Sequence, residues 1–256
     1  MKSSGNTILI TGGGSGIGRE LAQRFHDLGN TVIVTGRRRS ALEETVAGRD
    51  KLHAAELDVT DPQAIQDFAR SVLAQHPGLN VIINNAGIMR DEPLDRGRDL
   101  NDAEETVTTN ILGPIRVTNA FIDHLIACGD GTIVNVTSGL AFVPFTLAPT
   151  YSASKAAIHS YTASLREELK GRVEVIELAP PGVQTDLTPG QSTRQGYMPL
   201  RAFIDEVMNL FQQQPTPPEI LVERVSFLRN AERENRYDAT LSQLNETARA
   251  ARAAQE

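Results

Sequence analysis

The sequence predicts one α/β domain built on a doubly wound, parallel β-sheet. Short apolar runs rich in Val and Ile alternate with longer amphipathic stretches along most of the 256 residues. This alternation is typical of strands joined by crossover helices. A glycine-rich segment also joins the first apolar run to the first amphipathic stretch. The length fits one such domain, and no linker or repeat divides the chain.

The same periodicity predicts the position of each strand and helix along the chain. Buried strands are predicted where Val, Ile and Leu cluster, at residues 7–11, 31–35, 52–57, 79–84, 131–137 and 172–179. Helices are predicted at 16–28, 40–47, 62–75, 103–128, 151–170, 200–213 and 218–230. Asp61 and Pro62 start the third helix with a capping carboxylate and a first-turn proline. A (β/α)8 barrel would show a similar alternation, so periodicity alone leaves both architectures open.

The composition and net charge of the chain argue against several classes of protein. The chain carries 25 Lys and Arg against 32 Asp and Glu, a net charge of −7, which argues against a general nucleic-acid or membrane-surface binder. The apolar run at residues 8–10 is too short for a signal peptide, and no stretch approaches the roughly 20 apolar residues that span a bilayer. Cys128 is the single cysteine, and no metal-ligand spacing occurs. We expect a cytoplasmic protein without a metal.

The glycine-rich segment indicates a nucleotide site. Gly12, Gly16 and Gly18 lie between the first strand and the first helix. Glycines at this position permit a tight turn, let the backbone approach a pyrophosphate, and leave the N–H groups of the helix N-terminus free for the anion. A glycine-rich β-turn is the structural alternative.

The end of the second strand indicates which nucleotide is bound. An NAD site usually has a carboxylate here for the ribose 2′-hydroxyl, whereas this chain has Gly36 followed by Arg37, Arg38 and Arg39. Guanidinium groups match the geometry of a 2′-phosphate, and Ser15 can donate a further hydrogen bond. The sequence therefore favours NADP(H) over NAD(H). The alternative is a solvated helix start, although three cations there oppose the helix dipole.

Tyr151 and Lys155 form a candidate catalytic pair. Their spacing places both on one face of the predicted helix 151–170. An ammonium close to a phenol depresses the phenol's pKa from about 10 and eases proton exchange near neutral pH. Ser138 ends the fifth strand, at the sheet edge where ligands bind in open α/β folds. The structural alternatives are an ordinary helical surface pair and a strand-end cap.

Together these residues resemble the short-chain dehydrogenase/reductase family over residues 7–187, with the DltE-type oxidoreductases as the nearest subgroup. The matching motifs occur in the family's order: Gly12, Gly16 and Gly18; Asp58-Val59; Asn84-Asn85-Ala86-Gly87; Asn110; Ser138; Tyr151 and Lys155; and Pro181-Gly182-Val183-Gln184-Thr185. The resemblance implies a Rossmann-type fold and removes the barrel. The family's usual glycine-rich pattern after Pro218 is missing, so we expect the chain to lack a standard seventh strand.

The resemblance also implies roles for residues. Tyr151 is the expected general acid or base, Lys155 holds the nicotinamide ribose, Ser138 positions the carbonyl, and Asn110 kinks its helix within a proton relay. The expected cofactor-binding residues are Gly12, Gly14, Ser15, Gly16, Ile17, Gly18, Arg37, Arg38, Asp58, Val59, Asn84, Ala86, Gly87, Tyr151, Lys155, Pro181, Gly182, Val183 and Thr185.

Apolar residues near the expected site suggest a mainly hydrophobic substrate bound by Leu140, Phe142, Phe145 and Tyr197. We expect residues 1–230 to form the nucleotide-binding domain, with a substrate lid around 187–213 and a polar extension or tail at 231–256. The resemblance implies a homodimer through helices 103–128 and 151–170, with a tetramer also possible.

The sequence thus predicts an NADPH-dependent carbonyl reductase, or alcohol dehydrogenase in the reverse direction, that acts on a ketone or aldehyde. Two alternatives remain open at this point: an NAD-dependent alcohol dehydrogenase, and a non-catalytic NADP-binding scaffold or sensor on the same fold.

Overall fold

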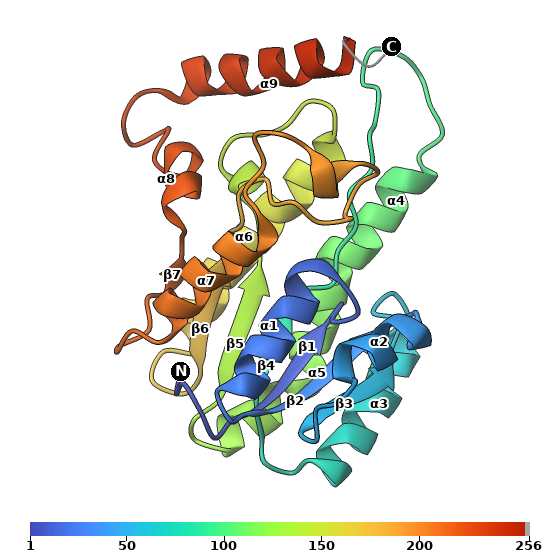
Figure 1. Ribbon diagram of the computed structural model, residues 1–256, viewed down its shortest axis with the longest axis vertical. Coiled ribbons are helices and arrows are strands. Elements are labelled where there is room, and N and C mark those ends of the chain that lie inside the picture. The colour runs from blue at the N-terminus through green and yellow to red at the C-terminus, as the bar shows by residue number, and fades with distance from the viewer. Residues whose placement is uncertain (254–256) are drawn as a thin grey trace.

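Seven parallel strands form the centre of the computed structural model, which describes residues 1–253 (Figure 1). Their order across the sheet is β3-β2-β1-β4-β5-β6-β7. The strands are β1 (Thr7–Thr11), β2 (Thr31–Gly36), β3 (Leu52–Glu56), β4 (Leu79–Asn84), β5 (Thr132–Val136), β6 (Glu174–Leu178) and β7 (Glu219–Ile220). The predicted doubly wound sheet is therefore confirmed, and the barrel is excluded because β3 and β7 lie at opposite edges.

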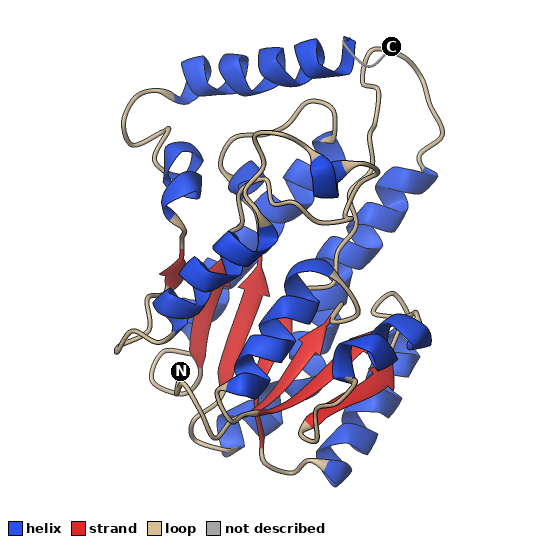
Figure 2. Cartoon of the chain, viewed as in Figure 1, coloured by secondary structure: helices blue, strands red, loops and turns tan. Residues whose placement is uncertain are grey.

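Helices cover both faces of the sheet (Figure 2). They are α1 (Gly16–Asp27), α2 (Arg39–Val46), α3 (Pro62–Gln75), α4 (Asn101–Val107), α5 (Gly113–Ala127), α6 (Pro149–Glu168), α7 (Leu200–Phe211), α8 (Glu223–Arg229) and α9 (Tyr237–Ala253). Because strand side chains alternate between faces, Ile8 and Ile10 pack with α1 and α7, whereas Leu9 packs with α3 and α5. The two resulting cores fix the sheet between its helical layers.

The order of the strands predicts where a ligand binds. The chain moves outward from β1 to β3 and then returns to place β4 on the other side of β1. The connections after β1 and β4 therefore leave the sheet in opposite directions and open a crevice at the carboxyl ends of these strands. The glycine-rich segment that follows β1 lies at this switch point.

The seventh strand corrects the expectation that the chain lacks one. Residues 219–220, predicted as the start of a helix, pair in parallel with β6. Glu177 N donates to Pro218 O at 2.9 Å and Ala179 N donates to Ile220 O at 3.3 Å. A two-residue strand carries no alternation of apolar and polar residues, so only its backbone pairing with β6 identifies it. The helix predicted for 218–230 is confined to α8.

The long predicted helix 103–128 is also divided. Residues Thr108–Leu112 form a π-helical turn between α4 and α5, and Gly113 N donates to Thr108 O, five residues back. Pro114 follows in the first turn of α5 and has no N–H for the carbonyl of Asn110, which disfavours a continuous α-helix here. The interruption expected at Asn110 is this widened turn.

The C-terminal segment forms α9, which crosses the carboxyl-end side of the molecule in Figure 1. The buried side chain of Asn245 attaches it to the loop after β5, accepting from Thr146 N at 2.7 Å and donating to Pro144 O at 3.1 Å. Of the helices within residues 1–253, none is both long enough and apolar enough to cross a membrane.

Candidate active site

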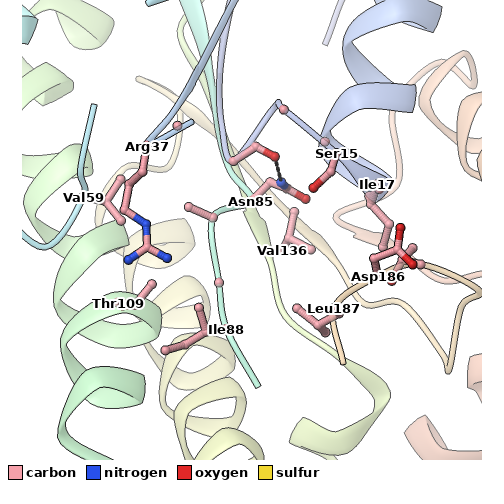
Figure 3. A pocket seen from close by; sticks show the side chains of 18 of the residues that line it. Ser15, Ile17, Arg37, Val59, Asn85, Ile88, Thr109, Val136, Asp186 and Leu187 are labelled. Atoms are coloured by element: carbon pink, nitrogen blue, oxygen red, sulfur yellow. Dashed lines mark hydrogen bonds between the residues drawn. The ribbon is translucent and has the colours of Figure 1, made fainter. Parts of the chain in front are cut away.

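The glycine loop is shaped by close backbone contacts. Gly12 and Gly16 have φ values of 70° and 52°, in the left-handed region that favours glycine. A Cβ on Gly18 would lie 2.4 Å from the Gly12 oxygen. Asn85 Nδ2 holds the loop by donating to Thr11 O at 3.0 Å and Gly12 O at 3.1 Å (Figure 3). The N-terminus of α1 is thereby presented to the crevice, with the Ser15 hydroxyl making no cap hydrogen bond.

A cavity of about 600 Å³ occupies the crevice, a size within the rough 300–1,000 Å³ range of small-molecule sites. It extends from the end of β2, past the glycine loop, to the end of β5. The predicted residues that line it are Gly12, Gly14, Ser15, Gly16, Ile17, Gly18, Arg37, Arg38, Asp58, Val59, Ala86, Gly87, Ser138, Tyr151, Lys155, Pro181, Val183 and Thr185.

Three other predicted residues do not line the cavity. Asn84 points into the core, where its Nδ2 donates to Thr118 Oγ1 and Asn135 Oδ1; the next residue, Asn85, lies at the cavity instead. Gly182 faces the ring of Tyr197. Asn110 is buried behind the wall, where it accepts from Ile88 N at 2.9 Å and donates to Ile88 O at 2.8 Å.

The predicted substrate residues Leu140, Phe142, Phe145 and Tyr197 also lie outside this lining. Phe142 is enclosed by the His159 ring, 5.1 Å away between centroids, and by the Arg229 guanidinium, 4.9 Å from its centroid. Its apolar character thus serves packing against α8.

Ser138, Tyr151 and Lys155 come together at the β5 end of the cavity, and all three are buried. Ser138 follows β5, while Tyr151 and Lys155 lie on one face of the first turns of α6. Lys155 Nζ donates to Val136 O at 2.9 Å and lies 5.5 Å from the centroid of the Tyr151 ring. The predicted pair is therefore part of the site and not an exposed helical pair.

The electrostatics of the pair differ from the expectation. Burial raises the pKa of Tyr151 to about 12, although a hydrogen bond to Ser138 lowers it in part. Burial lowers the pKa of Lys155 to about 8. The predicted depression of the phenol's pKa is wrong for this structure, because desolvation of the phenolate is the largest effect on Tyr151, while the Lys155 ammonium donates to Val136 O. A protonated phenol is a hydrogen-bond and proton donor.

Hydrogen bonds behind the site fix its walls. Asn110 Nδ2 also contacts Ser154 Oγ at 3.1 Å and so joins the π-helical turn to α6. The Glu92 carboxylate, 2% exposed, accepts from Thr150 Oγ1 at 2.8 Å and pairs with Arg98 at 2.7 Å. Thr150 directly precedes Tyr151, so this contact holds the start of α6 against the loop after β4.

Two arginines lie at the β2 end of the cavity. Gly36, Arg37 and Arg38 line the cavity at the end of β2, and Arg37 Nη1 lies 3.8 Å from Glu105 Oε1. The side chain of Arg37 lies beside Val59 and points toward Thr109 (Figure 3). Arg39 does not line the cavity, because it pairs with Glu43 one turn later on α2. The predicted cationic triplet is therefore a cationic pair.

Sequence reasoning missed several lining residues, including Ile88, Arg90, Thr109, Asp186 and Gln191. Gln191 is buried and donates to Val183 O at 2.9 Å and Thr185 Oγ1 at 3.1 Å. Nothing in the local sequence distinguishes a glutamine that folds back onto the site from one that faces solvent. Within residues 1–253, no three His, Cys, Asp or Glu side chains are placed to hold a metal ion.

Comparison with known proteins gives consistent matches. The family described as short chain dehydrogenase matches residues 6–196. "Uncharacterized oxidoreductase DltE" of Bacillus subtilis is 38% identical over 250 residues, which cover 96% of this chain and 98% of that protein. "Sulfoacetaldehyde reductase 2" of Chromohalobacter salexigens is 37% identical over 186 residues, which cover 71% and 74%. The structure of a short chain dehydrogenase from Burkholderia cenocepacia in complex with NADP has a TM-score of 0.82 and 26% identity, covering 95% and 99%.

The pair of half-buried His159 and buried Glu177 predicts a pH-dependent stability. His159 Nδ1 lies 2.8 Å from Glu177 Oε2, and Thr137 Oγ1 donates to Glu177 Oε1 at 2.6 Å. The hydrogen bond to Glu177 raises the pKa of His159, against the opposing effects of burial and Arg229. The stability that the pair contributes is fully present below the unfolded pKa of about 6.5 and is lost as pH rises through the folded value.

We therefore expect His159→Gln to cost more free energy of unfolding at about pH 6 than at about pH 8.5. Urea denaturation at the two pH values measures the difference. In a Glu177→Gln background, replacing His159 should no longer cost more at about pH 6, because the hydrogen bond to Glu177 is the largest cause of the raised pKa. An equal cost at both pH values in the native background would contradict the assignment.

Proposed function

The chain belongs to the short chain dehydrogenase family, whose members act on CH–OH and C=O groups, and we propose that it is an NADPH-dependent carbonyl reductase with Tyr151 as the general acid. The observation that carries the proposal is the burial of Ser138, Tyr151 and Lys155 together at one end of the cavity. A pure nucleotide-binding scaffold needs no such group of proton donors, which disfavours that alternative.

The residues around the cavity fit an NADP-type dinucleotide. Gly12 and Gly18 have no room for a Cβ, and Gly16 has a left-handed φ. The loop exposes the N-terminus of α1, which suits a pyrophosphate. Asp58 and Val59 would hold the adenine end. Lys155, Pro181, Val183 and Thr185 would hold the nicotinamide end. When bound, the reduced nicotinamide supplies the hydride that the carbonyl carbon receives.

Side chains of the protein bind the carbonyl oxygen and supply the proton that it receives. The hydroxyls of Ser138 and Tyr151 donate hydrogen bonds to the carbonyl oxygen and orient it. As negative charge develops on that oxygen, the proton of Tyr151 Oη passes to it. The ammonium of Lys155, which lies over the tyrosine ring, stabilises the phenolate that remains. Asn110 acts by holding Ile88 and α6 in place.

Two observations support reduction as the direction. The raised pKa of Tyr151 keeps the phenol protonated near neutral pH, which suits an acid better than a base. One relative at 37% identity is named as a reductase of an aldehyde. An NAD-dependent alcohol dehydrogenase would need a carboxylate after β2, where Gly36 and Arg37 stand.

The substrate has a mainly apolar body in this proposal. Ile88 and Leu187 line the cavity, whereas the expected Leu140, Phe142 and Phe145 do not. Residues 1–230 form the nucleotide-binding domain in this proposal, with an extension at 231–256. Of the lid expected around 187–213, the part that forms α7 packs in the core instead, so the proposed lid is confined to residues 187–198. The cytoplasmic location stays a prediction of the sequence.

The general acid is tested by Tyr151→Phe. We expect the rate of NADPH-linked ketone reduction to fall by at least about 10²-fold, the usual contribution of a positioned acid, while the Kd for NADPH changes little. Absorbance at 340 nm measures turnover, and cofactor fluorescence measures binding. Tyr161→Phe, on the same helix but outside the cavity lining, is the matched control and should keep full activity. Retained turnover in Tyr151→Phe would refute the role.

The cofactor preference is tested by single replacements after β2. Arg37→Ala and Arg38→Ala should each weaken NADPH binding by about 10- to 100-fold, the value of a hydrogen bond between charged groups, with little effect on NADH. Arg39→Ala is the control, because Arg39 pairs with Glu43. Equal losses for both nucleotides would contradict a 2′-phosphate site.

We also propose a homodimer through the helices at α4, α5 and α6, with a tetramer as a further possibility. Val107 and Leu112 support it, because these apolar side chains are 38% and 37% exposed on the helix expected at the interface. Phe227 on α8 is another exposed apolar residue, at 50%, and marks the C-terminal region as the competing interface.

The interface is tested by light scattering after size exclusion. We expect the wild type to have twice the mass of the chain, and Val107→Asp combined with Leu112→Asp to give the mass of one chain. Phe227→Asp should leave the dimer intact. Dissociation by Phe227→Asp alone would place the interface at the C-terminal region instead.

A further inference from the structure

The segment after β6 folds back over the nicotinamide end of the cavity as a flap, residues 187–198. Met198 N donates to Gly182 O at 2.8 Å, and Gln184 N donates to Met198 O at 2.9 Å, so the end of the flap pairs with its start. Gln191 binds the middle of the flap to Val183 and Thr185. These contacts fix the position of the side chains that the flap carries.

Two of those side chains, the cationic Arg194 and the phenol Tyr197, contact each other. Arg194 Nη1 donates to Tyr197 Oη at 3.2 Å, and the guanidinium carbon lies 5.2 Å from the centroid of the Tyr197 ring. Gln184 Nε2 donates to Arg194 O at 3.2 Å and anchors the backbone of the arginine. Both side chains are half-buried, so the guanidinium keeps donors free for a further acceptor.

Tyr197, the phenol of this pair, packs against a segment that lines the cavity. A Cβ on Gly182 would lie 3.2 Å from the Tyr197 ring, and Gly182 stands between the cavity residues Pro181 and Val183. Burial is the main cause of the raised pKa of Tyr151, and the charge of Tyr197 is a further cause, so the two phenols interact. Because Arg194 is bonded to Tyr197, the pair lies next to the part of the cavity wall that Pro181 and Val183 form.

The charge of Arg194 also distinguishes it from its neighbours. Three other arginines near the cavity have carboxylate partners: Arg37 and Arg90 pair with Glu105, and Arg98 pairs with Glu92. Arg38, which lines the cavity at its β2 end, forms no salt bridge among the described residues. Among the residues that the structure describes, Arg194 forms no salt bridge. Asp186, the acidic residue of the adjoining segment, lies toward Ser15 and Ile17 at the glycine loop (Figure 3).

We propose that Arg194 and Tyr197 bind a carboxylate of the substrate, while Tyr151 and Ser138 bind its carbonyl oxygen. The substrate is then an oxo acid with an apolar body, and the flap recognises its charge. A guanidinium matches a carboxylate through two parallel hydrogen bonds, and the Tyr197 hydroxyl supplies a third donor. The inference rests on the proposed carbonyl reductase function and extends it to a substrate class.

The test compares oxo acids with their methyl esters as substrates for NADPH-linked reduction. The probes are 2-oxopentanoate, 3-oxobutanoate and 4-oxopentanoate, which differ in the spacing of carbonyl and carboxylate. We expect kcat/KM for at least one acid to exceed that of its ester by about tenfold or more. Arg194→Ala should remove this preference by raising KM for the acid about 10- to 100-fold, with the ester unchanged.

Two controls separate recognition from structure. Arg194→Lys, which keeps the charge without the planar fork, should restore part of the preference. Arg201→Ala, on an exposed arginine of α7, should change neither substrate. If Arg194→Ala lowers acid and ester equally, the pair only holds the flap in place and the proposal fails.

Failure here and failure of the proposed function give different results. Turnover of the esters without a preference for any acid keeps the reductase and overturns the carboxylate site. If no probe is reduced, calorimetric titration of the three acids into the protein with NADP⁺ decides the matter. At least one acid should bind, and Arg194→Ala should weaken it about tenfold or more; absence of binding overturns the proposal.

Discussion

The site depends on the burial of one ammonium group. Lys155 is 5% exposed, and a buried amine must be hydrogen-bonded. Its donor contact with Val136 O binds the first turns of α6 to the last residue of β5. A Cβ on Gly87 would lie 3.5 Å from the ammonium and 3.3 Å from Asn110 Oδ1, so the loop after β4 is shaped around the same group. The positions of Tyr151 and Ser138 follow from this arrangement.

A chain of buried side-chain hydrogen bonds holds together the strands and the helix that carry the reacting groups. Asn84 Nδ2 donates to Asn135 Oδ1 at 2.9 Å, and Asn135 Nδ2 donates to Thr162 Oγ1 at 2.9 Å. These bonds connect β4, β5 and α6 through the core, where a lost partner is costly. The reacting groups therefore stand on the ends of strands and helices, whereas the proposed substrate contacts of residues 187–198 lie on a loop.

The parts of the fold and site that the sequence predicts correctly are those encoded by local sequence patterns. Six strands, the glycine loop and the Tyr151–Lys155 spacing are local patterns, and the structure has them. The strand β7 and the inward orientation of Asn84 depend on long-range backbone pairing and on packing. The sequence predicts Phe142 as a substrate contact, because apolar side chains of a pocket and of a core look alike in sequence. Only its packing against Arg229 of α8 shows that it belongs to the core.

The pKa of Tyr151 is the property that spacing predicted least well, because an adjacent cation and burial act in opposite directions and only the three-dimensional surroundings decide between them. In the proposed mechanism, burial keeps this phenol protonated, as a donor to the carbonyl. The direct measurement is a ¹³C NMR titration of the chain labelled at tyrosine Cζ, with the signal assigned through Tyr151→Phe. With a pKa raised to about 12, the signal should stay at its phenol position up to about pH 10. A transition to phenolate between about pH 6 and 9 would contradict the account.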